Sequence, residues 1–260
     1  MVRVTEQDLK DPYYFQYAFL NQKPHFKQKE VLRSKAKHKV ICCGRRAGKT
    51  QMIAGEIIRG AIFNIFPKQI VIAPVYKQAL IVYSKILEIL RQNKLIDDLR
   101  SYPKNPYPKI EWINGSFVDF GSTDKPDSLR GEAYDRIFLD ESSFIKDEAM
   151  SAIRPFTFDT DAPIWQTSTP WGKNHFYEDF RRGEKGLKGY QSFHFTSFDN
   201  PYINQERVKE EVEYYGRTSL YVRAEIYGEF IESADLYFTQ ELIESCIKEY
   251  PMVRKEEVYR

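Results

Sequence analysis

One short segment combines the residue types that bind phosphate. Directly after the apolar run 39–43 the chain reads Gly44-Arg45-Arg46-Ala47-Gly48-Lys49-Thr50. This spacing is one residue short of the phosphate-loop (P-loop) pattern G-x-x-x-x-G-K-[ST], because Cys43 stands at the first glycine position. Such a loop turns backbone N–H groups and the positive end of a helix toward a phosphate. In that role Lys49 would reach the β- and γ-phosphates, and the Thr50 hydroxyl would ligate Mg²⁺.

The other reading of this segment is an ordinary glycine-containing turn with a surface lysine. The flanking pattern favours the phosphate loop, since a short apolar strand precedes it and apolar residues at helical spacing follow it over residues 51–66. We therefore expect residues 44–50 to bind a nucleotide. Arg45, in preference to Arg46, would lie against the γ-phosphate as a charge sensor. The alternative for either arginine is a side chain that points into solvent.

A pair of adjacent acids supplies the second half of a hydrolytic site. Asp140 and Glu141 directly follow the apolar run 137–139. Ligands of open α/β sheets bind at the carboxyl ends of the strands, where these acids would stand. One carboxylate can hold a hydrated Mg²⁺ while the other orients and polarises the attacking water. We assign the first role to Asp140 and the second to Glu141.

The elements around these residues alternate between strand and helix. The pattern predicts helices over 26–34, 51–66 and 79–90, the second ended by Pro67, and strands over 39–43, 69–73, 136–139, 164–167 and 190–195. Asn114-Gly115 predicts a hairpin between 110–113 and 116–120. This order indicates an α/β fold with a mainly parallel sheet flanked by helices. Helices over 205–215 and 218–226 predict a small lid or linker, so we divide the chain into a core (1–197) and a lid subdomain (198–260).

Composition sets broader limits. The chain has 260 residues and a formal net charge of +2, with no apolar run of membrane-spanning length. Its three cysteines make no disulfide framework, which is typical of a reducing compartment. Charge is uneven: the stretch from Lys23 to Lys49 holds ten Lys or Arg residues and one acid, Glu30. This basic stretch could lie near phosphates or form a solvated face.

Taken together, the motifs resemble the ATPase domain of a large terminase subunit, the genome-packaging motor of tailed bacteriophages. The resemblance covers nearly the whole chain in family order. Its residues are Gly44–Thr50, Ile72–Ala79, Pro126–Gly131, Ile137–Glu141, Thr167–Pro170, Asp199–Tyr202 and Tyr227–Phe230.

This resemblance implies a P-loop fold of the ASCE type, with ATP and Mg²⁺ as cofactors and Glu141 as the catalytic glutamate. It implies that Thr167–Pro170 is the coupling motif, with Thr169 as the γ-phosphate sensor. It suggests that Gln28 reads adenine; the alternative is a surface glutamine on a basic helix. Arg130 matches an arginine finger that completes the active site of a neighbouring subunit, and the alternative is a structural arginine that holds its own loop.

The same resemblance implies partners and a place of action. The partners are double-stranded DNA, a portal protein and a small terminase subunit. When assembled, copies of the chain would form a homo-oligomeric ring, expected to be a pentamer, and the alternative for the chain alone is a monomer. The site of action would be the host cytoplasm, at the portal of a procapsid, with no membrane. After Phe230 only thirty residues remain, so we expect no nuclease domain and no DNA cleavage. Two other functions stay open: a helicase-like nucleic-acid translocase, and a nucleotide-dependent DNA-binding switch without turnover.

Overall fold

The computed structural model describes residues 10–124 and 133–231. Its strands form one sheet in the order β3-β4-β5-β2-β6-β7-β1-β8. The six strands β5, β2, β6, β7, β1 and β8 are parallel to one another. Strand β4 pairs antiparallel with both β3 and β5. The bounds are β1 (His38–Cys43), β2 (Lys68–Ala73), β3 (Leu99–Ser101), β4 (Lys109–Trp112), β5 (Phe117–Ser122), β6 (Arg136–Asp140), β7 (Ile164–Ser168) and β8 (Tyr190–Phe195). Strand β7 therefore separates β1 from β6, as the ASCE arrangement requires, and the expected fold class is confirmed.

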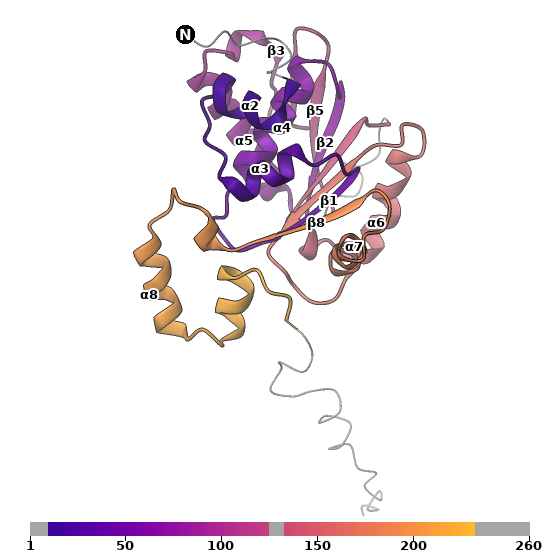
Figure 1. Cartoon of the computed structure of the whole chain (residues 1–260). Coiled ribbons are helices and arrows are strands. Elements are labelled where there is room, and N and C mark those ends of the chain that lie inside the picture. The colour runs from indigo at the N-terminus through magenta and orange to yellow at the C-terminus, as the bar shows by residue number, and fades with distance from the viewer. Residues whose placement is uncertain (1–9, 125–132, 232–260) are drawn as a thin grey trace, which may run out of the picture.

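Helices cover both faces of this sheet (Figure 1). Helices α4 and α5 lie on one face with α2 and α3 nearby, and α6 and α7 lie on the other. Their bounds are α2 (Pro12–Tyr14), α3 (Phe26–Arg33), α4 (Lys49–Ile62), α5 (Tyr76–Gln92), α6 (Asp147–Ile153), α7 (His175–Glu184) and α8 (Gln205–Tyr215). Short turns complete the described chain: π turns η1 (Phe15–Phe19) and η7 (Val222–Ile226), and 3-10 turns η2 (Ile96–Asp98), η4 (Ser142–Phe144), η5 (Arg154–Thr157) and η6 (Ser197–Asp199).

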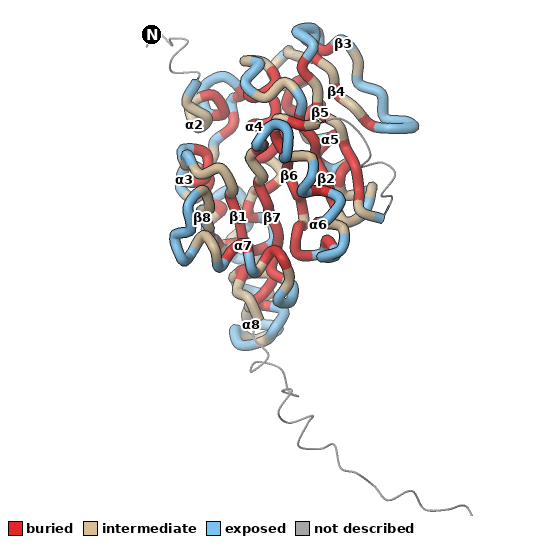
Figure 2. The backbone as a smooth tube through the Cα atoms, turned by 90° about the vertical axis from the view of Figure 1, so that its right-hand side faces the viewer, coloured by how far each residue is buried: buried red, intermediate tan, exposed pale blue. Residues whose placement is uncertain are grey.

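The central strands are buried on both faces, which explains their continuous apolar sequences (Figure 2). Strand β1 shows how the two faces are shared. Ile41 and Cys43 belong to the large core cluster beneath α4 and α5, whereas Val40 and Cys42 pack in a second cluster with aromatic side chains of α7. The alternation of a strand thus places the two neighbouring cysteines on opposite faces, and both are free thiols.

The predicted hairpin is present: β4 and β5 pair antiparallel, and Gly115 in their turn has a φ of 86°. Two predicted helix boundaries are wrong. Helix α4 ends at Ile62, before Pro67, because Asn64 turns into the left-handed region with a φ of 53°. The predicted helix 218–226 is reduced to the π turn η7.

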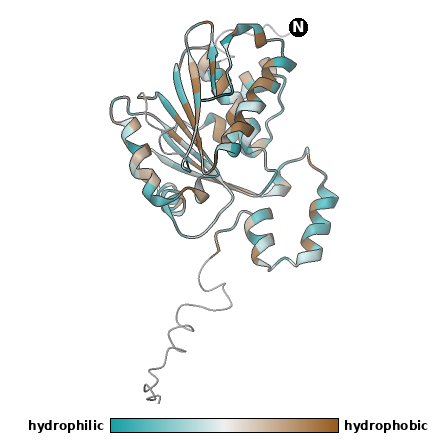
Figure 3. Ribbon diagram, turned by 180° about the vertical axis from the view of Figure 1, so that it is seen from behind, coloured by the Kyte–Doolittle hydropathy of each residue, from teal (hydrophilic) through white to brown (hydrophobic). Residues whose placement is uncertain are grey.

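Helix α8 and η7 stand apart from the sheet, on the side where β1 and β8 end (Figure 1). Helix α8 has no buried residue and is mostly hydrophilic (Figure 3). The polar pattern of residues 205–215 predicted such a helix correctly. Within the described residues, no helix is both long enough and apolar enough to cross a membrane.

Candidate active site

The predicted phosphate loop is the tight turn between β1 and α4. Gly48 has a φ of 90°, and a Cβ there would lie 2.5 Å from Nε2 of Gln28. On the other side, a Cβ on Gly44 would lie 2.2 Å from the carbonyl oxygen of Ile226 in η7. Glycine is therefore required at both positions, because other parts of the chain pack directly against the loop backbone.

Four carbonyl groups of the loop accept hydrogen bonds from side chains outside it. On the side of η6, Ser197 Oγ donates to Arg45 O at 2.7 Å and Asn200 Nδ2 to Arg46 O at 2.6 Å. On the α3 side, His25 Nε2 donates to Ala47 O at 3.0 Å and Gln28 Nε2 to Gly48 O at 2.9 Å. The loop is therefore fixed in shape from both sides, and burial lowers the pKa of His25.

Gln28 is buried, so the alternative of a surface glutamine is wrong. Its Oε1 accepts from the backbone N–H of His25 at 3.0 Å while its Nε2 bonds the loop. Gln28 and Gly48 line a cavity of about 410 Å³ beside the loop, together with Gln16, Asn21, Gln22, Gln51, Gln92, Asn200 and Tyr202. We expect a base joined to a loop-bound phosphate to lie in this cavity, and adenine reading by Gln28 stays a prediction.

The two acids meet the loop across β7. Asp140 is the buried last residue of β6, and its Oδ1 accepts from Thr167 Oγ1 at 2.9 Å. Glu141 follows in a left-handed conformation with a φ of 52°. Glu141 Oε1 lies 3.0 Å from Lys49 Nζ, and Oε2 accepts from Ser168 Oγ at 3.3 Å. A strained backbone of this kind is concentrated at functional sites.

Charge at this point is tightly coupled. Burial, and next the charge of Glu141, raise the pKa of Asp140 to about 6, although Lys49 and the Thr167 hydrogen bond act in the opposite direction. Burial alone would lower the pKa of Lys49, but its acidic neighbours, Glu141 and Asp140 among them, hold it above the ordinary value. A second cation would relieve the crowded carboxylates. Asp140 and Thr50 offer hard oxygen donors, so the residues present fit Mg²⁺.

The coupling segment contacts the acids through residues other than the predicted one. Thr167 bonds Asp140 and Ser168 bonds Glu141, as described above. Thr169 is buried, and its carbonyl oxygen accepts from Ser143 Oγ at 2.6 Å. The sensor role of the Thr169 hydroxyl stays a prediction, and sequence reasoning missed the direct contacts of its two neighbours.

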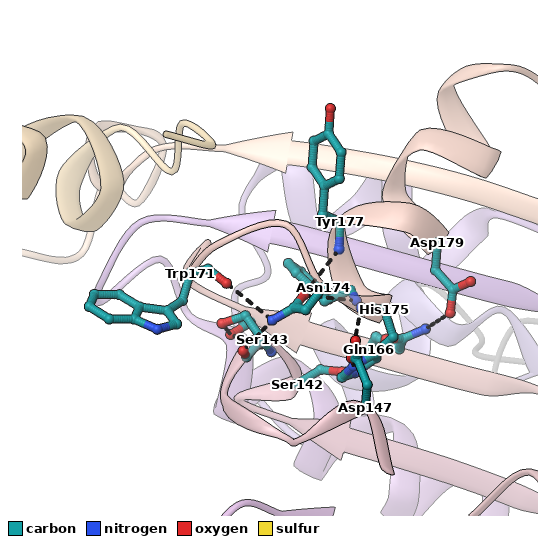
Figure 4. Close-up of polar contacts among 11 residues, drawn as sticks. Ser142, Ser143, Asp147, Gln166, Trp171, Asn174, His175, Tyr177 and Asp179 are labelled. Carbon is teal, nitrogen blue, oxygen red and sulfur yellow. Dashed lines mark hydrogen bonds and ion pairs between the residues drawn. The ribbon is translucent and has the colours of Figure 1, made fainter. Parts of the chain in front are cut away.

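A polar network behind the acids joins three elements (Figure 4). Asn174 Nδ2 donates to the carbonyl of Ser143 at 2.6 Å, and its Oδ1 caps the first turn of α7. Ser142 Oγ donates to Gln166 Oε1 at 2.9 Å and lies 3.1 Å from His175 Nε2. The turn after Glu141, strand β7 and helix α7 are thereby held together.

Sequence reasoning missed this network because it did not predict helix α7. The signals were present in the sequence. Asn174 is a favoured helix N-cap, and the buried Phe176 and Phe180 follow at a spacing of four residues.

The predicted arginines lie in different surroundings. The Arg45 guanidinium pairs with the carboxylate of Glu225, while its backbone N–H donates to Glu225 O at 2.6 Å. Arg46 is exposed, with a φ of 59°. Contact of either side chain with a γ-phosphate stays a prediction. Arg130 lies outside the described residues.

Comparisons with known proteins show the family to which this chain is related. The family model "Terminase large subunit, T4likevirus-type, N-terminal" matches residues 40–245. The large terminase subunits of Thermus phage G20c and Thermus virus P23-45 are each 30% identical over 263 residues, a match that covers 86% of this chain and 52% of theirs. The chain therefore spans about half the length of these curated relatives.

Solved structures show the same fold. The ATPase domain of the large terminase of Thermus phage P74-26 has a TM-score of 0.68 and 27% identity, covering 89% of this chain and 100% of that domain. The HK97 bacteriophage large terminase has a TM-score of 0.68 and 16% identity, covering 86% of this chain and 57% of that one. The large terminase of bacteriophage D6E, in complex with ADP, has a TM-score of 0.64 and 16% identity, covering 80% and 54%.

Proposed function

Because this chain belongs to the terminase large-subunit family, matching its N-terminal model, we propose that it is an ATP-hydrolysing motor domain. In this proposal it drives double-stranded viral DNA into a procapsid. The observation that carries the proposal is the meeting of three side chains: Lys49 from the loop, Glu141 beyond β6, and Ser168 from the strand between them. That arrangement supplies a phosphate-binding cation and a water-polarising base at one point.

We propose the following division of work. The loop backbone and Lys49 hold the β- and γ-phosphates at the start of α4. Thr50 and Asp140 would hold Mg²⁺, which neutralises charge on the transferring phosphoryl group. Glu141 orients and polarises the attacking water, and its carboxylate is positioned by Lys49 and Ser168. Catalysis then consists mainly of positioning and electrostatic stabilisation.

The contacts of the loop with η6 and η7 support residues 198–260 as a lid or linker that responds to the nucleotide. The Arg45 side chain is held by Glu225 of η7, and the Arg46 carbonyl by Asn200, the residue that follows η6. A γ-phosphate would compete with Glu225 for the Arg45 guanidinium. Nucleotide binding would in this way alter the attachment of the lid to the core.

A trans arginine finger at Arg130 remains part of the proposal. A guanidinium from a neighbouring subunit would stabilise transition-state charge, worth about 10³–10⁵ in rate in other NTPases. Arg130→Ala and Glu141→Gln, each inactive alone, should regain some activity when mixed, because some interfaces then join an intact Arg130 to an intact Glu141. A mixture that assembles normally and stays inactive would exclude the trans finger.

We further propose that DNA, a portal protein and a small terminase subunit are the partners, in a ring of copies of this chain at the procapsid portal in the host cytoplasm. The chain alone should bind duplex DNA weakly and with a steep salt dependence, through Lys and Arg contacts to phosphate. A marked sequence preference, or binding that is insensitive to salt, would count against a packaging motor. The expected lack of nuclease activity stays a prediction.

The helicase-like translocase is the second candidate function, because it would use the same loop and acids. The test compares ATP turnover by the purified chain with portal-bearing procapsids plus duplex DNA, and with a forked duplex. A packaging motor is stimulated by the first and does not separate strands. Strand separation coupled to turnover, without stimulation by procapsids, would favour the helicase instead.

A further inference from the structure

A second cavity lies at the end of the sheet opposite the phosphate loop. Its volume is about 360 Å³, and the starts of β1, β6 and β7 contribute Lys39, Arg136 and Trp165 to its wall. The second half of α4 adds Glu56 and Arg59. The first residues of parallel strands share one edge, and the loop follows the last residue of β1, so this cavity is separate from the nucleotide site.

The wall of this cavity carries an excess of buried positive charge. Lys39, Arg59 and Arg136 are 3%, 7% and 4% exposed. Among the residues that line the cavity, Glu56 is the one acid, and Lys35 and Lys37 add two further cations. Of the nearby acids outside the wall, Asp161 pairs with Lys37 and offsets the charge of that lysine, whereas Asp11 pairs with Arg33, which does not line the cavity.

Glu56 is fully engaged by the two arginines. Its carboxylate accepts from Arg59 at 2.7 and 2.9 Å and from Arg136 at 2.8 Å. Burial would raise the pKa of Glu56, but the guanidinium groups lower it to about 2, so the carboxylate is ionised. The single negative charge of Glu56 thus faces two buried guanidinium groups and the Lys39 amine, which leaves an excess of one positive charge when Lys39 is neutral and two when it is protonated.

Lys39 and Arg136 can each donate a further hydrogen bond to an acceptor in the cavity. Lys39 Nζ donates to Val31 O at 2.7 Å and lies 4.1 Å from the centre of the Trp165 ring, and an ammonium has three donors. The Arg136 guanidinium lies 4.5 Å from the same ring centre, so both cations stand over one aromatic side chain. Among the described residues, the buried Arg136 Nε has no hydrogen-bond partner.

Buried charges are normally paired, and unpaired buried donors are rare. We propose that this cavity binds a small oxyanion of the phosphate type, held by Lys39 and Arg136 above Trp165. The volume suffices for one tetrahedral ion with water, since a water molecule takes about 30 Å³ of the liquid. Burial lowers the pKa of Lys39 to about 7. Glu56 acts to raise this pKa, whereas the charges of Arg136 and Arg59 lower it further. A bound anion would favour the protonated, charged form of Lys39.

Phosphate chemistry of this kind has two sources: the free inorganic ion and a phosphodiester of DNA. The burial of Lys39 and Arg136 favours the free ion, because a phosphate fixed on the backbone of a duplex could not reach these recessed side chains. The basic stretch noted in the sequence supplies Lys35, Lys37 and Lys39 to this cavity. In this proposal the basic stretch binds phosphate at both ends of β1: in the loop after its last residue, and in this cavity beside its first residues.

The test uses inorganic phosphate and the full chain carrying Lys49→Ala, so that the P-loop does not dominate binding. Calorimetric titration at pH 7 and constant ionic strength should show one site. Adding Lys39→Met should weaken it at least tenfold, whereas adding Lys188→Met, at an exposed lysine, should not. If a short duplex displaces phosphate, the site is supported and its ligand is a phosphodiester of DNA. If the duplex does not displace phosphate, the site is supported and its ligand is the free ion.

Absence of phosphate binding in the Lys49→Ala chain, or equal affinity with and without Lys39→Met, would overturn the proposal. A second measurement needs no substitution. In the wild-type chain, ¹³C NMR of the lysine ε-carbons should show one lysine that titrates near pH 7, and phosphate should raise its midpoint by at least one pH unit. An unmoved midpoint would overturn the proposal even if Lys39→Met failed to fold.

Discussion

The ammonium of Lys49 lies 3.0 Å from the carboxylate Oε1 of Glu141, and this ion pair joins the phosphate loop directly to the acidic turn after β6. Lys49 is at the start of α4, and Glu141 follows a strand that is separated from β1 by β7. An ammonium has three donors, so it can bond Glu141 and a phosphate at the same time. In the proposed mechanism, Lys49 would therefore link nucleotide binding to Glu141, the residue proposed to polarise water.

Replacement of this lysine should remove nucleotide binding. In Lys49→Ala, the charge beside the β- and γ-phosphates is lost, and the carboxylates of the buried Asp140 and the half-buried Glu141 lose their cation. We expect affinity for a fluorescent ATP analogue to fall at least a hundredfold, while Lys85→Ala, at a half-buried helix position outside the site, has no effect. Unchanged binding by the Lys49 variant would refute the assignment of the loop.

The hydrogen bond from Thr167 to Asp140 should control binding of Mg²⁺. This bond favours the ionised carboxylate, whose pKa burial has raised to about 6, so Thr167→Val should raise that pKa further. Ionisation of Asp140 would then require a higher pH, and the half-saturating Mg²⁺ concentration for ATP turnover should rise several-fold below pH 7. Thr157→Val, at a threonine outside the site, is the control. Identical Mg²⁺ curves for Thr167→Val and wild type would contradict this role.

The sequence predicted those parts of the site that are local in the chain. The loop between β1 and α4, and the acids at the end of β6, each depend on a few consecutive residues, and all are where the pattern placed them. The contact of Thr167 with Asp140 joins residues 27 positions apart and depends on which strands are neighbours. Strand order follows from packing of the whole sheet, so the sequence pattern identified the strands that carry the site without showing which side chains would meet.

The cluster at the base of the sheet was beyond sequence reasoning for the same physical reason. Glu56, Arg59 and Arg136 look like ordinary charged residues of a helix and a strand end, yet they are buried together. Breaking a buried pair leaves an uncompensated charge, so Glu56→Gln should lower the free energy of unfolding by about 3–5 kcal/mol. Glu88→Gln, which removes an exposed pair with Lys85, should cost about 0–1 kcal/mol. Equal effects in urea unfolding would show that the cluster is not stabilising.

The buried Lys39 should make stability depend on pH. Burial lowers its folded pKa to about 7, from an unfolded value near 10.5. As the pH falls from 10.5 to 7, the unfolded chain binds a proton that the folded chain does not, so the free energy of unfolding falls. Between pH 7 and pH 10.5, the free energy of unfolding of the wild type should therefore rise with pH relative to that of Lys39→Met. The slope of this rise should correspond to a difference of at most one bound proton between the unfolded and folded chains. Parallel pH curves for the two proteins, measured by urea unfolding in phosphate-free buffer, would contradict the burial of a neutral amine.

The most direct measurement of the central claim is single-turnover hydrolysis of radiolabelled ATP with Mg²⁺ by the purified chain and its Glu141→Gln variant. The amide keeps the shape of Glu141 but cannot polarise water, so the variant should bind ATP and Mg²⁺ as the wild type does. The account predicts that the wild type forms ADP and phosphate in the single turnover, whereas ATP bound to the variant stays intact. Hydrolysis by Glu141→Gln at the wild-type rate, or no hydrolysis by either protein, would contradict the assignment of this chain as an ATPase that uses Glu141.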